Sequence, residues 1–232
     1  MAANLLWYGQ AGYLLSTEKT SFIIDPYFSD SIGGSGFIRL YKSPVDKGEV
    51  KVDYALATHN HGDHLDIETL RDYIEFGNFY GPSSCVKAMK AAGFPDQKLH
   101  ALDRGGQAEI GDIKLSAYYA EHTEDSISVL AECGGIKILF TGDSLFSPKL
   151  FAGGPRPDIL VVPINGKFGN MTWQEAVLFA HRLKVKTVIP CHYDLFHINS
   201  ADPDLFAQSF RDSPIRCVIL EKNKKVTLGS LL

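Results

Sequence analysis

The sequence predicts a globular protein of mixed α/β (α+β) class, folded as a single domain over residues 1–232. The composition has 45% hydrophobic and 22% charged residues, which is the balance of a chain that can bury a sizeable core. Short apolar runs alternate with longer segments of helical periodicity, so each half of the chain holds both kinds of element. We find no repeat, low-complexity tract or linker that would divide the chain.

Charge and cysteine content narrow the expected partners. The net charge of −4 disfavours nucleic acid as the main partner, because phosphate binding requires a positive surface. No stretch approaches the roughly 20 apolar residues of a membrane helix, and the N-terminus lacks the basic region of a signal peptide. The four cysteines are scattered and fit reduced thiols. We therefore expect a cytoplasmic protein that acts on a small molecule, without nucleic acid or membrane as a partner. Assembly of identical copies stays open.

The predicted strands are of two kinds. Runs rich in Ile, Val and Leu and bounded by breakers predict buried strands at 21–26, 52–59, 136–143, 158–165 and 187–194. Runs with turns between them predict antiparallel strands at 4–9, 11–17, 113–120 and 127–135, and a final hairpin from 217–223 and 224–230.

Four helices are predicted between these strands, at 66–75, 83–92, 172–183 and 203–211. Asp66 is a suitable N-cap for the first helix. The third begins with a capping box, because Thr172 is followed three residues later by Glu175. The fourth has Pro203 at its first position, where a missing N–H costs nothing.

Residues 27–50 form a long segment with little periodicity, around a Gly-Gly-Ser-Gly sequence. A loop of this length inside a compact domain is usually functional or disordered. We interpret it as a flap over an active site that bears Arg39 and Lys42. The alternative is a solvated surface excursion.

The five buried strands each finish on a polar residue, namely Asp25, His59, Asp143, Asn165 and His192. In open α/β sheets, ligands bind at the carboxyl ends of the strands. If the strands lie side by side, their ends bring these groups to one place.

The stretch "THNHGDHLD", residues 58–66, follows one of these strands and concentrates metal-ligand chemistry. Imidazole and carboxylate groups bind divalent ions such as Zn²⁺, Mn²⁺ or Fe²⁺. Gly62 allows the sharp backbone path that would aim the ligands at neighbouring points. A single histidine would suggest an ordinary surface residue, but four such ligands in six residues predict a metal site.

The spacing H-x-H-x-D-H after a strand is the signature of the metallo-β-lactamase superfamily, and the chain resembles that family over essentially its whole length. "AEHTED" offers His122, "FTGDS" offers Asp143 and "PCHYD" offers His192, in the family's order. The resemblance implies a four-layer αββα sandwich with a metal site at the sheet edge.

Several segments resemble more narrowly the branch that contains L-ascorbate-6-phosphate lactonase. They are "LLWYGQAGYLL", "IDPYFSDS", "GPSSCVKAMKAAGF", "FTGDSLF", "PINGKFGNMT" and "PCHYDLF". This resemblance implies action on lactones or sugar-phosphate-like substrates, with two divalent ions that are Mn²⁺ or Zn²⁺. Fe²⁺ is also compatible with the ligand types.

Carried over position by position, the resemblance implies two metal sites joined by one carboxylate. One metal would be held by His59, His61 and His122, the second by Asp63, His64 and His192, and both by Asp143. Asp25 and Asp66 would support the ligands from behind, since a metal-bound imidazole usually needs a partner on its other nitrogen.

We expect a metal-bound hydroxide to open a lactone or small ester, with phosphorylated sugars among the candidate substrates. Asp143 would bridge the ions and Asp63 would pass on the proton. Two alternatives remain open, a phosphodiesterase acting on nucleotides or phospholipids, and a non-hydrolytic metal-binding protein. The loop 163–172 opens into a helix, and a helix N-terminus suits an anion. Expected substrate contacts are Asn165, Lys167, Asn170, Tyr193 and Arg39.

Overall fold

The computed structural model of the protein describes residues 3–232 and contains two seven-stranded sheets. The first sheet runs in the order β14 (Val226–Thr227), β1 (Asn4–Gly9), β2 (Gly12–Ser16), β3 (Ser21–Ile24), β4 (Val50–Leu56), β5 (Ile74–Gly81) and β6 (Leu99–Ala101). The second runs in the order β13 (Arg216–Cys217), β12 (Thr187–Cys191), β11 (Ile159–Pro163), β10 (Ile136–Phe140), β9 (Ile127–Cys133), β8 (Ile113–Tyr119) and β7 (Gln107–Ile110).

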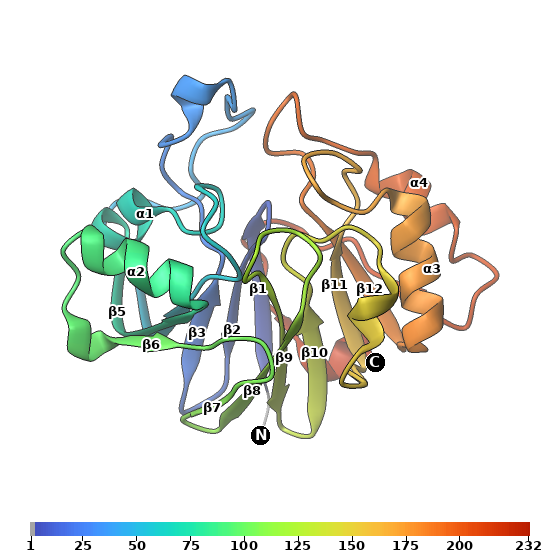
Figure 1. Cartoon of the computed structure of the whole chain (residues 1–232). Coiled ribbons are helices and arrows are strands. Elements are labelled where there is room, and N and C mark those ends of the chain that lie inside the picture. Colours follow the sequence, from blue (N-terminus) through green and yellow to red (C-terminus); the bar gives the residue numbers. More distant parts are fainter. Residues whose placement is uncertain (1–2) are drawn as a thin grey trace.

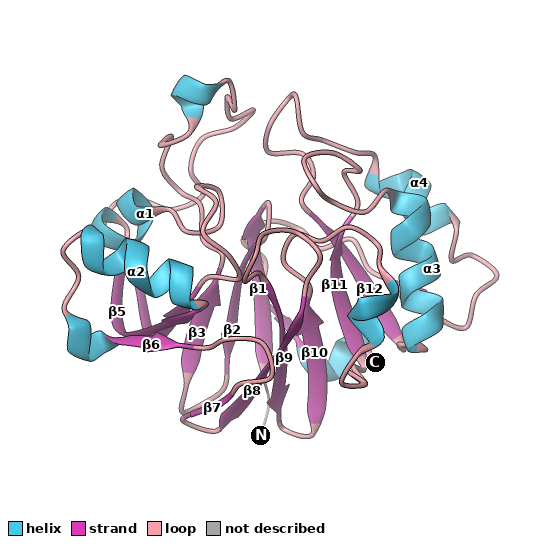
Figure 2. Ribbon diagram, in the orientation of Figure 1, coloured by secondary structure: helices cyan, strands magenta, loops and turns pink. Residues whose placement is uncertain are grey.

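Helices cover the outer face of each sheet, as Figure 1 and Figure 2 show. The helices are α1 (Ile67–Asp72), α2 (Ser83–Ala91), α3 (Trp173–Leu183) and α4 (Pro203–Gln208). The first two lie outside the first sheet and the other two outside the second, which gives the predicted αββα order of layers. Within residues 3–232, none of the helices has the length and apolar character that crossing a bilayer requires.

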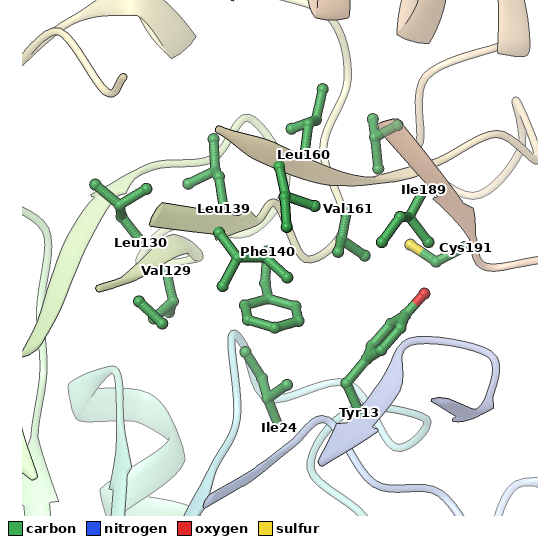
Figure 3. Packing of buried hydrophobic residues seen from close by; sticks show 14 of the residues in the cluster. Tyr13, Ile24, Val129, Leu130, Leu139, Phe140, Leu160, Val161, Ile189 and Cys191 are labelled. Atoms are coloured by element: carbon green, nitrogen blue, oxygen red, sulfur yellow. The ribbon is translucent and has the colours of Figure 1, made fainter. Parts of the chain in front are cut away.

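The main core lies between the two sheets, where side chains from both inner faces interdigitate (Figure 3). The ring of Phe140 on β10 packs 5.6 Å from Tyr13 on β2 and 6.3 Å from Phe22 on β3. Alternation along β3 sends Phe22 and Ile24 into this core and Ile23 into a second core beneath α1 and α2. Because both of its faces are covered, β3 is apolar throughout its length.

Most of the strands that carry the expected site residues have a parallel neighbour, the exception being β8 before His122, which is antiparallel to β7 and β9. β3 pairs with β4 in the first sheet, and β10, β11 and β12 pair in the second, all in parallel. The carboxyl ends of these strands therefore meet at one edge of the sandwich. The 27–50 loop and the loop that follows β12 rise from the same edge (Figure 1).

Three predictions about elements were wrong, and one of them is the helix predicted over 203–211, which ends at Gln208. The final hairpin does not form, because β13 pairs with β12 in the second sheet while β14 pairs with β1 in the first. The helix predicted over 66–75 ends at Asp72, and the chain continues directly into β5. The predicted N-cap of that helix and the capping box of α3 are both present.

Candidate metal centre

The seven side chains expected to bind metal come together at this edge of the sandwich. They form three overlapping groups, and within each group one ligand atom per residue lies within 4.8 Å of the others. The groups are His59, His61 and His122; His59, His64 and Asp143; and Asp63, His64 and His192. Residues more than 130 positions apart thus share one site because the parallel strands end together.

The motif after β4 is coiled so that its side chains converge. The backbone N–H groups of His64 and Leu65 both donate to the carbonyl of His61, at 3.0 and 2.8 Å. This turn brings the ring centroids of His59 and His64 to 4.1 Å. Gly62 has no side chain where Ile32 of the 27–50 loop approaches, since a Cβ there would lie 2.5 Å from that side chain.

The orientation of His64 is fixed from behind by Asp25. The Nδ1–H of His64 donates to Asp25 Oδ2 at 2.8 Å, which leaves Nε2 directed into the centre. Asp25 also accepts from the backbone N–H and the hydroxyl of Thr58, each at 2.7 Å. Asp25 therefore lies behind the candidate ligand His64, and both of its oxygens are already engaged.

His59 and His122 are oriented in the same way. Because the Thr58 hydroxyl donates its one proton to Asp25, it accepts from His59 Nδ1 at 3.2 Å. The carbonyl of Gly169 accepts from His122 Nδ1 at 3.1 Å. Both rings consequently turn an Nε2 lone pair towards the centre.

The residues fit a divalent metal ion on the grounds of their own bonding. His59 Nε2 is buried without a hydrogen-bond partner among the described residues, and such groups are costly unless something satisfies them. Asp143 Oδ1 is buried between the Nε2 atoms of His64 and His192, at 3.1 Å from each. The Nε2 atoms of His64 and His192 also face each other at 3.3 Å. A cation that accepts several lone pairs at once resolves these contacts.

The pKa values of the side chains in the metal-free centre also favour a metal site. Burial lowers the pKa of His59 well below its ordinary value. Burial also acts to lower the pKa of His64 and His192, but nearby carboxylates, above all Asp143, outweigh it and raise the pKa of His192 to about 9. Burial acts to raise the pKa of Asp63, and the imidazoles of His64 and His192 keep it low instead. In the absence of metal, protons on imidazole nitrogens offset the carboxylate charge.

Gln10, in the turn between β1 and β2, belongs to the centre and was missed in the sequence. Its side-chain Nε2 lies 3.0 Å from Asp63 Oδ2 and 3.0 Å from His192 Nε2, and its backbone carbonyl accepts from the backbone N–H of His192. The side chain is buried and its backbone is left-handed, with φ of 50°. The sequence feature that could have identified Gln10 is a polar residue in a glycine-containing turn between two apolar strands.

Strained backbone is concentrated around the centre. Asp25 and His192 also have positive φ values, of 48° and 60°. Residues other than glycine seldom adopt this conformation, which costs of the order of 1 kcal/mol or more and persists only where the surroundings enforce it. The strands end in this conformation and so turn their terminal side chains inward.

The loop 163–172 does not present the polar contacts expected of it. Asn165 and Asn170 are buried, and they hold the loop together by bonding Asn199 at 2.5 Å and the backbone N–H of Ser144 at 2.9 Å. Lys167 Nζ reaches away to the carbonyl of Ile198 at 3.2 Å. The sequence analysis predicted substrate contacts from the types of these residues. Hydrogen bonds within the protein determine where their side chains point.

The other expected contacts also have structural roles. Arg39 donates to the carbonyls of Tyr27 and Ser29, at 3.1 and 3.2 Å, and so pins the 27–50 loop. Tyr193 is buried against Trp7, with ring centroids 5.2 Å apart. Asp66 caps α1 and accepts from Ser29 Oγ at 2.5 Å, so it anchors the 27–50 loop rather than supporting a ligand.

A hollow of about 280 Å³ opens above the ligands. Residues of the centre form part of its lining, together with residues of three loops. The lining consists of Ile32, Ser35, Phe37, His61, Gly62, Asp63, Asp143, Phe168, His192 and Asn199. A substrate in this hollow would touch the metal ligands directly.

Comparisons with known proteins agree with this geometry. A family model described as "Beta-lactamase superfamily domain" matches residues 4–192. A UPF0173 protein of Pyrococcus furiosus is 27% identical over 211 residues, covering 90% of each chain. A UPF0173 metal-dependent hydrolase of Hyperthermus butylicus is 30% identical over 211 residues, covering 85% of this chain and 86% of that one.

A solved structure shares the fold. It is that of Igni18, a metallo hydrolase from Ignicoccus hospitalis, with a TM-score of 0.80 and 19% identity, covering 98% of this chain and 99% of that one. The chain belongs to the metallo-β-lactamase superfamily and, within it, to the UPF0173 family of metal-dependent hydrolases.

Proposed function

We propose that the protein hydrolyses a small ester or lactone at a centre of two divalent metal ions. The position of Asp143 carries this proposal. Its Oδ1 lies 3.1 Å from Nε2 of both His64 and His192, while its Oδ2 lies 3.7 Å from Nε2 of His122. One carboxylate thus faces two separate groups of ligands with different oxygens, as a bridging ligand would.

The chain supplies enough donors for both ions. One ion would be held by His59, His61 and His122, the other by Asp63, His64 and His192, with Asp143 between them. Imidazole and carboxylate ligands of this kind suit Zn²⁺, Mn²⁺ or Fe²⁺. Divalent ions bound here lower the pKa of water towards neutrality and polarise a carbonyl group.

Asp63 is the residue best placed to move a proton. It lines the hollow, and its Oδ2 is held by Gln10 Nε2 at 3.0 Å. Its pKa is low in the metal-free protein, so the carboxylate is ionised at neutral pH, and its position in the lining would let it accept a hydrogen bond from an attacking water. His61, His192 and Asp143 share the lining, so a carbonyl carbon in the hollow lies next to the ligands.

The test is hydrolysis by protein of known metal content, loaded with Mn²⁺ or with Zn²⁺. Substrates are p-nitrophenyl butyrate, a simple γ-lactone and the phosphodiester bis(p-nitrophenyl) phosphate. We expect turnover of the ester or the lactone, two ions per chain, and no turnover after metal removal. Turnover of the phosphodiester alone would establish the alternative function, and turnover by metal-free protein would refute the scheme.

Two variants test whether Asp143 is shared by the two metal ions. We expect Asp143→Asn to lose both ions and all activity, because both groups share this side chain. His122→Ala should lose one ion and keep the other, since Asp63, His64 and His192 remain. His181→Ala, on the exposed face of α3, is the matched control and should keep both ions. A single ion per wild-type chain would exclude the dinuclear centre.

A further inference from the structure

The hollow above the ligands combines a polar floor with apolar walls. His61, Asp63, Asp143 and His192 form the floor, and the walls carry the hydrophobic side chains Ile32, Phe37 and Phe168. Its volume of about 280 Å³ lies near the lower end of the range for small-molecule sites, roughly 300–1,000 Å³. The occupant is therefore small, and the part of it beyond the reacting group meets hydrocarbon.

The wall formed by the 27–50 loop is held in place by packing. Phe37 contacts Phe196 with ring centroids 5.5 Å apart, and Tyr27 contacts Phe196 at the same distance. The backbone N–H of Leu40 donates to the carbonyl of Leu195 at 2.8 Å. Ile32 reaches the metal motif itself, where Gly62 leaves room for it. These contacts keep the apolar side chains of the loop at the hollow.

Phe168 forms the opposite wall and is unusual in two respects. It is a large apolar side chain with 55% of its surface exposed, and its backbone has φ of 50°. An exposed aromatic side chain on a strained backbone contributes little to the stability of the folded protein. Its ring lies 5.2 Å from Phe37, so the two rings meet across the hollow. Between Gly166 and Gly169, the loop presents Phe168 to the hollow and the Gly169 carbonyl to His122.

The walls carry no positive charge. None of the described residues that line the hollow is lysine or arginine. The nearest candidates are engaged elsewhere, Arg39 with backbone carbonyls of its own loop and Lys167 with the carbonyl of Ile198. Bound metal ions would place positive charge at the floor only, beside Asp63 and Asp143. A phosphate or carboxylate farther along the substrate would find no cationic partner, only the side chains of Ser35 and Asn199, which replace its hydration less well than a charged donor would.

We propose that the hollow binds a small neutral substrate that carries one apolar group, a short alkyl chain or a single ring, next to the scissile bond. This inference rests on the proposed hydrolytic function. It departs from the phosphorylated sugar expected from the sequence. Phe168, Phe37 and Ile32 are assigned as the residues that determine specificity.

The experiment measures binding separately from turnover. Acetohydroxamate, butyrohydroxamate and the monohydroxamate of succinate are titrated into metal-loaded protein by calorimetry. All three present the same metal-binding group and differ only in the tail. Burial of a methylene group gives about a fourfold gain in affinity, so two give roughly fifteenfold. We expect butyrohydroxamate to bind about fifteenfold more tightly than acetohydroxamate, and the succinate compound more weakly than butyrohydroxamate.

Variants assign the preference to the wall. Phe168→Ala should remove most of the difference between butyrohydroxamate and acetohydroxamate, and Phe168→Leu should keep it. Leu178→Ala, an exposed apolar residue on α3, is the control and should leave the ratio unchanged. Metal content is measured for each variant, because Gly169 beside Phe168 holds His122.

The outcomes separate the two proposals. Equal binding of the two alkyl compounds, or tighter binding of the succinate compound, overturns the apolar hollow whether or not esters are hydrolysed. If butyrohydroxamate binds as expected but no ester or lactone is turned over, the hydrolytic function is wrong and the apolar site stands. Full retention of the preference in Phe168→Ala overturns the assignment of that residue.

Discussion

Asp25 Oδ2 lies 2.8 Å from His64 Nδ1, and this bond determines which nitrogen of the imidazole faces the metal centre. Asp25 accepts three hydrogen bonds in all, two of them from Thr58. Through the Thr58 hydroxyl the same network orients His59. One buried carboxylate thus fixes ligands of both groups, although it directs none of its lone pairs at the centre.

Asp25→Asn should weaken metal binding by roughly 10- to 100-fold, as loss of partners behind metal ligands typically does. An amide nitrogen cannot accept a hydrogen bond, so at least one of the three donors loses its acceptor, and two do if the nitrogen replaces Oδ2. Asn tolerates the left-handed backbone at this position, with φ of 48°, so the fold should persist. The measurement is competition with a chelator, followed by metal analysis.

The control for this variant is Asp53→Asn. Asp53 accepts two hydrogen bonds from Ser21, both at 2.8 Å, at the far end of β3 and β4. Like Asp25, Asp53 is an aspartate that accepts from a backbone N–H and from a hydroxyl, but it lies away from the metal centre. Its substitution should therefore leave metal affinity unchanged. Equal affinity in Asp25→Asn and the wild type would show that His64 keeps its orientation without Asp25.

Gln10→Ala should weaken the ion held by Asp63 and His192 selectively. The side chain contacts both residues at about 3.0 Å, and no such contact reaches His59, His61 or His122. We expect one ion to be bound as in the wild type and the second roughly 10- to 100-fold more weakly. Gln107→Ala, at an exposed position on β7, is the control. Equal weakening of both ions would contradict this selective role.

The convergence of the seven candidate ligands could be predicted from the sequence because a local motif and the general geometry of sheets both point to this edge. Four of the seven lie in one short motif, and His122, Asp143 and His192 each follow a strand-like run. Parallel strands that end together are a general property of such sheets. The motif and the strand ends share His59 and together include six of the seven residues, while His122 follows β8, which is antiparallel to both of its neighbours, and was reached through the family resemblance.

Gln10 could not be predicted in this way. It contacts His192 across 182 residues of sequence, and a lone glutamine in a turn has no distinctive local pattern. The directions of the Arg39 and Lys167 side chains could not be predicted either, because long side chains bond to whichever partner the tertiary structure places near them. β5 was missed for a similar reason, since Gly77 reads as a breaker. A Cβ there would lie 2.7 Å from the carbonyl oxygen of Asp53, so close strand packing requires the glycine.

The stability of the metal-free protein should fall as the pH rises from about 6.5 to 9. Asp143 and its neighbours raise the pKa of His192 to about 9 in the folded protein, against about 6.5 in the unfolded chain. The proton therefore stabilises the folded state fully below pH 6.5, and this contribution is lost as pH passes through 9. At about 1.4 kcal/mol per pKa unit, the contribution of His192 to this loss is at most about 3 kcal/mol, and the raised pKa of His64 acts in the same direction.

Urea unfolding of metal-free protein at pH 6.5 and pH 9.5 measures this loss. His192→Gln should show a smaller difference between the two pH values, since it removes the titrating group. Metal loading should reverse the trend, because ions displace these protons and bind more tightly as pH rises. An unfolding free energy that is the same at both pH values would contradict the raised pKa.

Gly169→Ala should remove one metal ion and leave the other. A Cβ at this position would lie 2.6 Å from His122 Nδ1, and the backbone is left-handed with φ of 86°. The ring of His122 would have to move away from His59 and His61, while the ligands Asp63, His64 and His192 stay in place. Gly154→Ala is a matched control, because it imposes a left-handed φ of 64° on alanine with no atom within 4 Å. Metal analysis after gel filtration should give one ion for Gly169→Ala and two for the control. If Gly169→Ala retains two ions at wild-type affinity, His122 does not depend on this close approach of the loop, and the link between the apolar wall and the metal centre is absent.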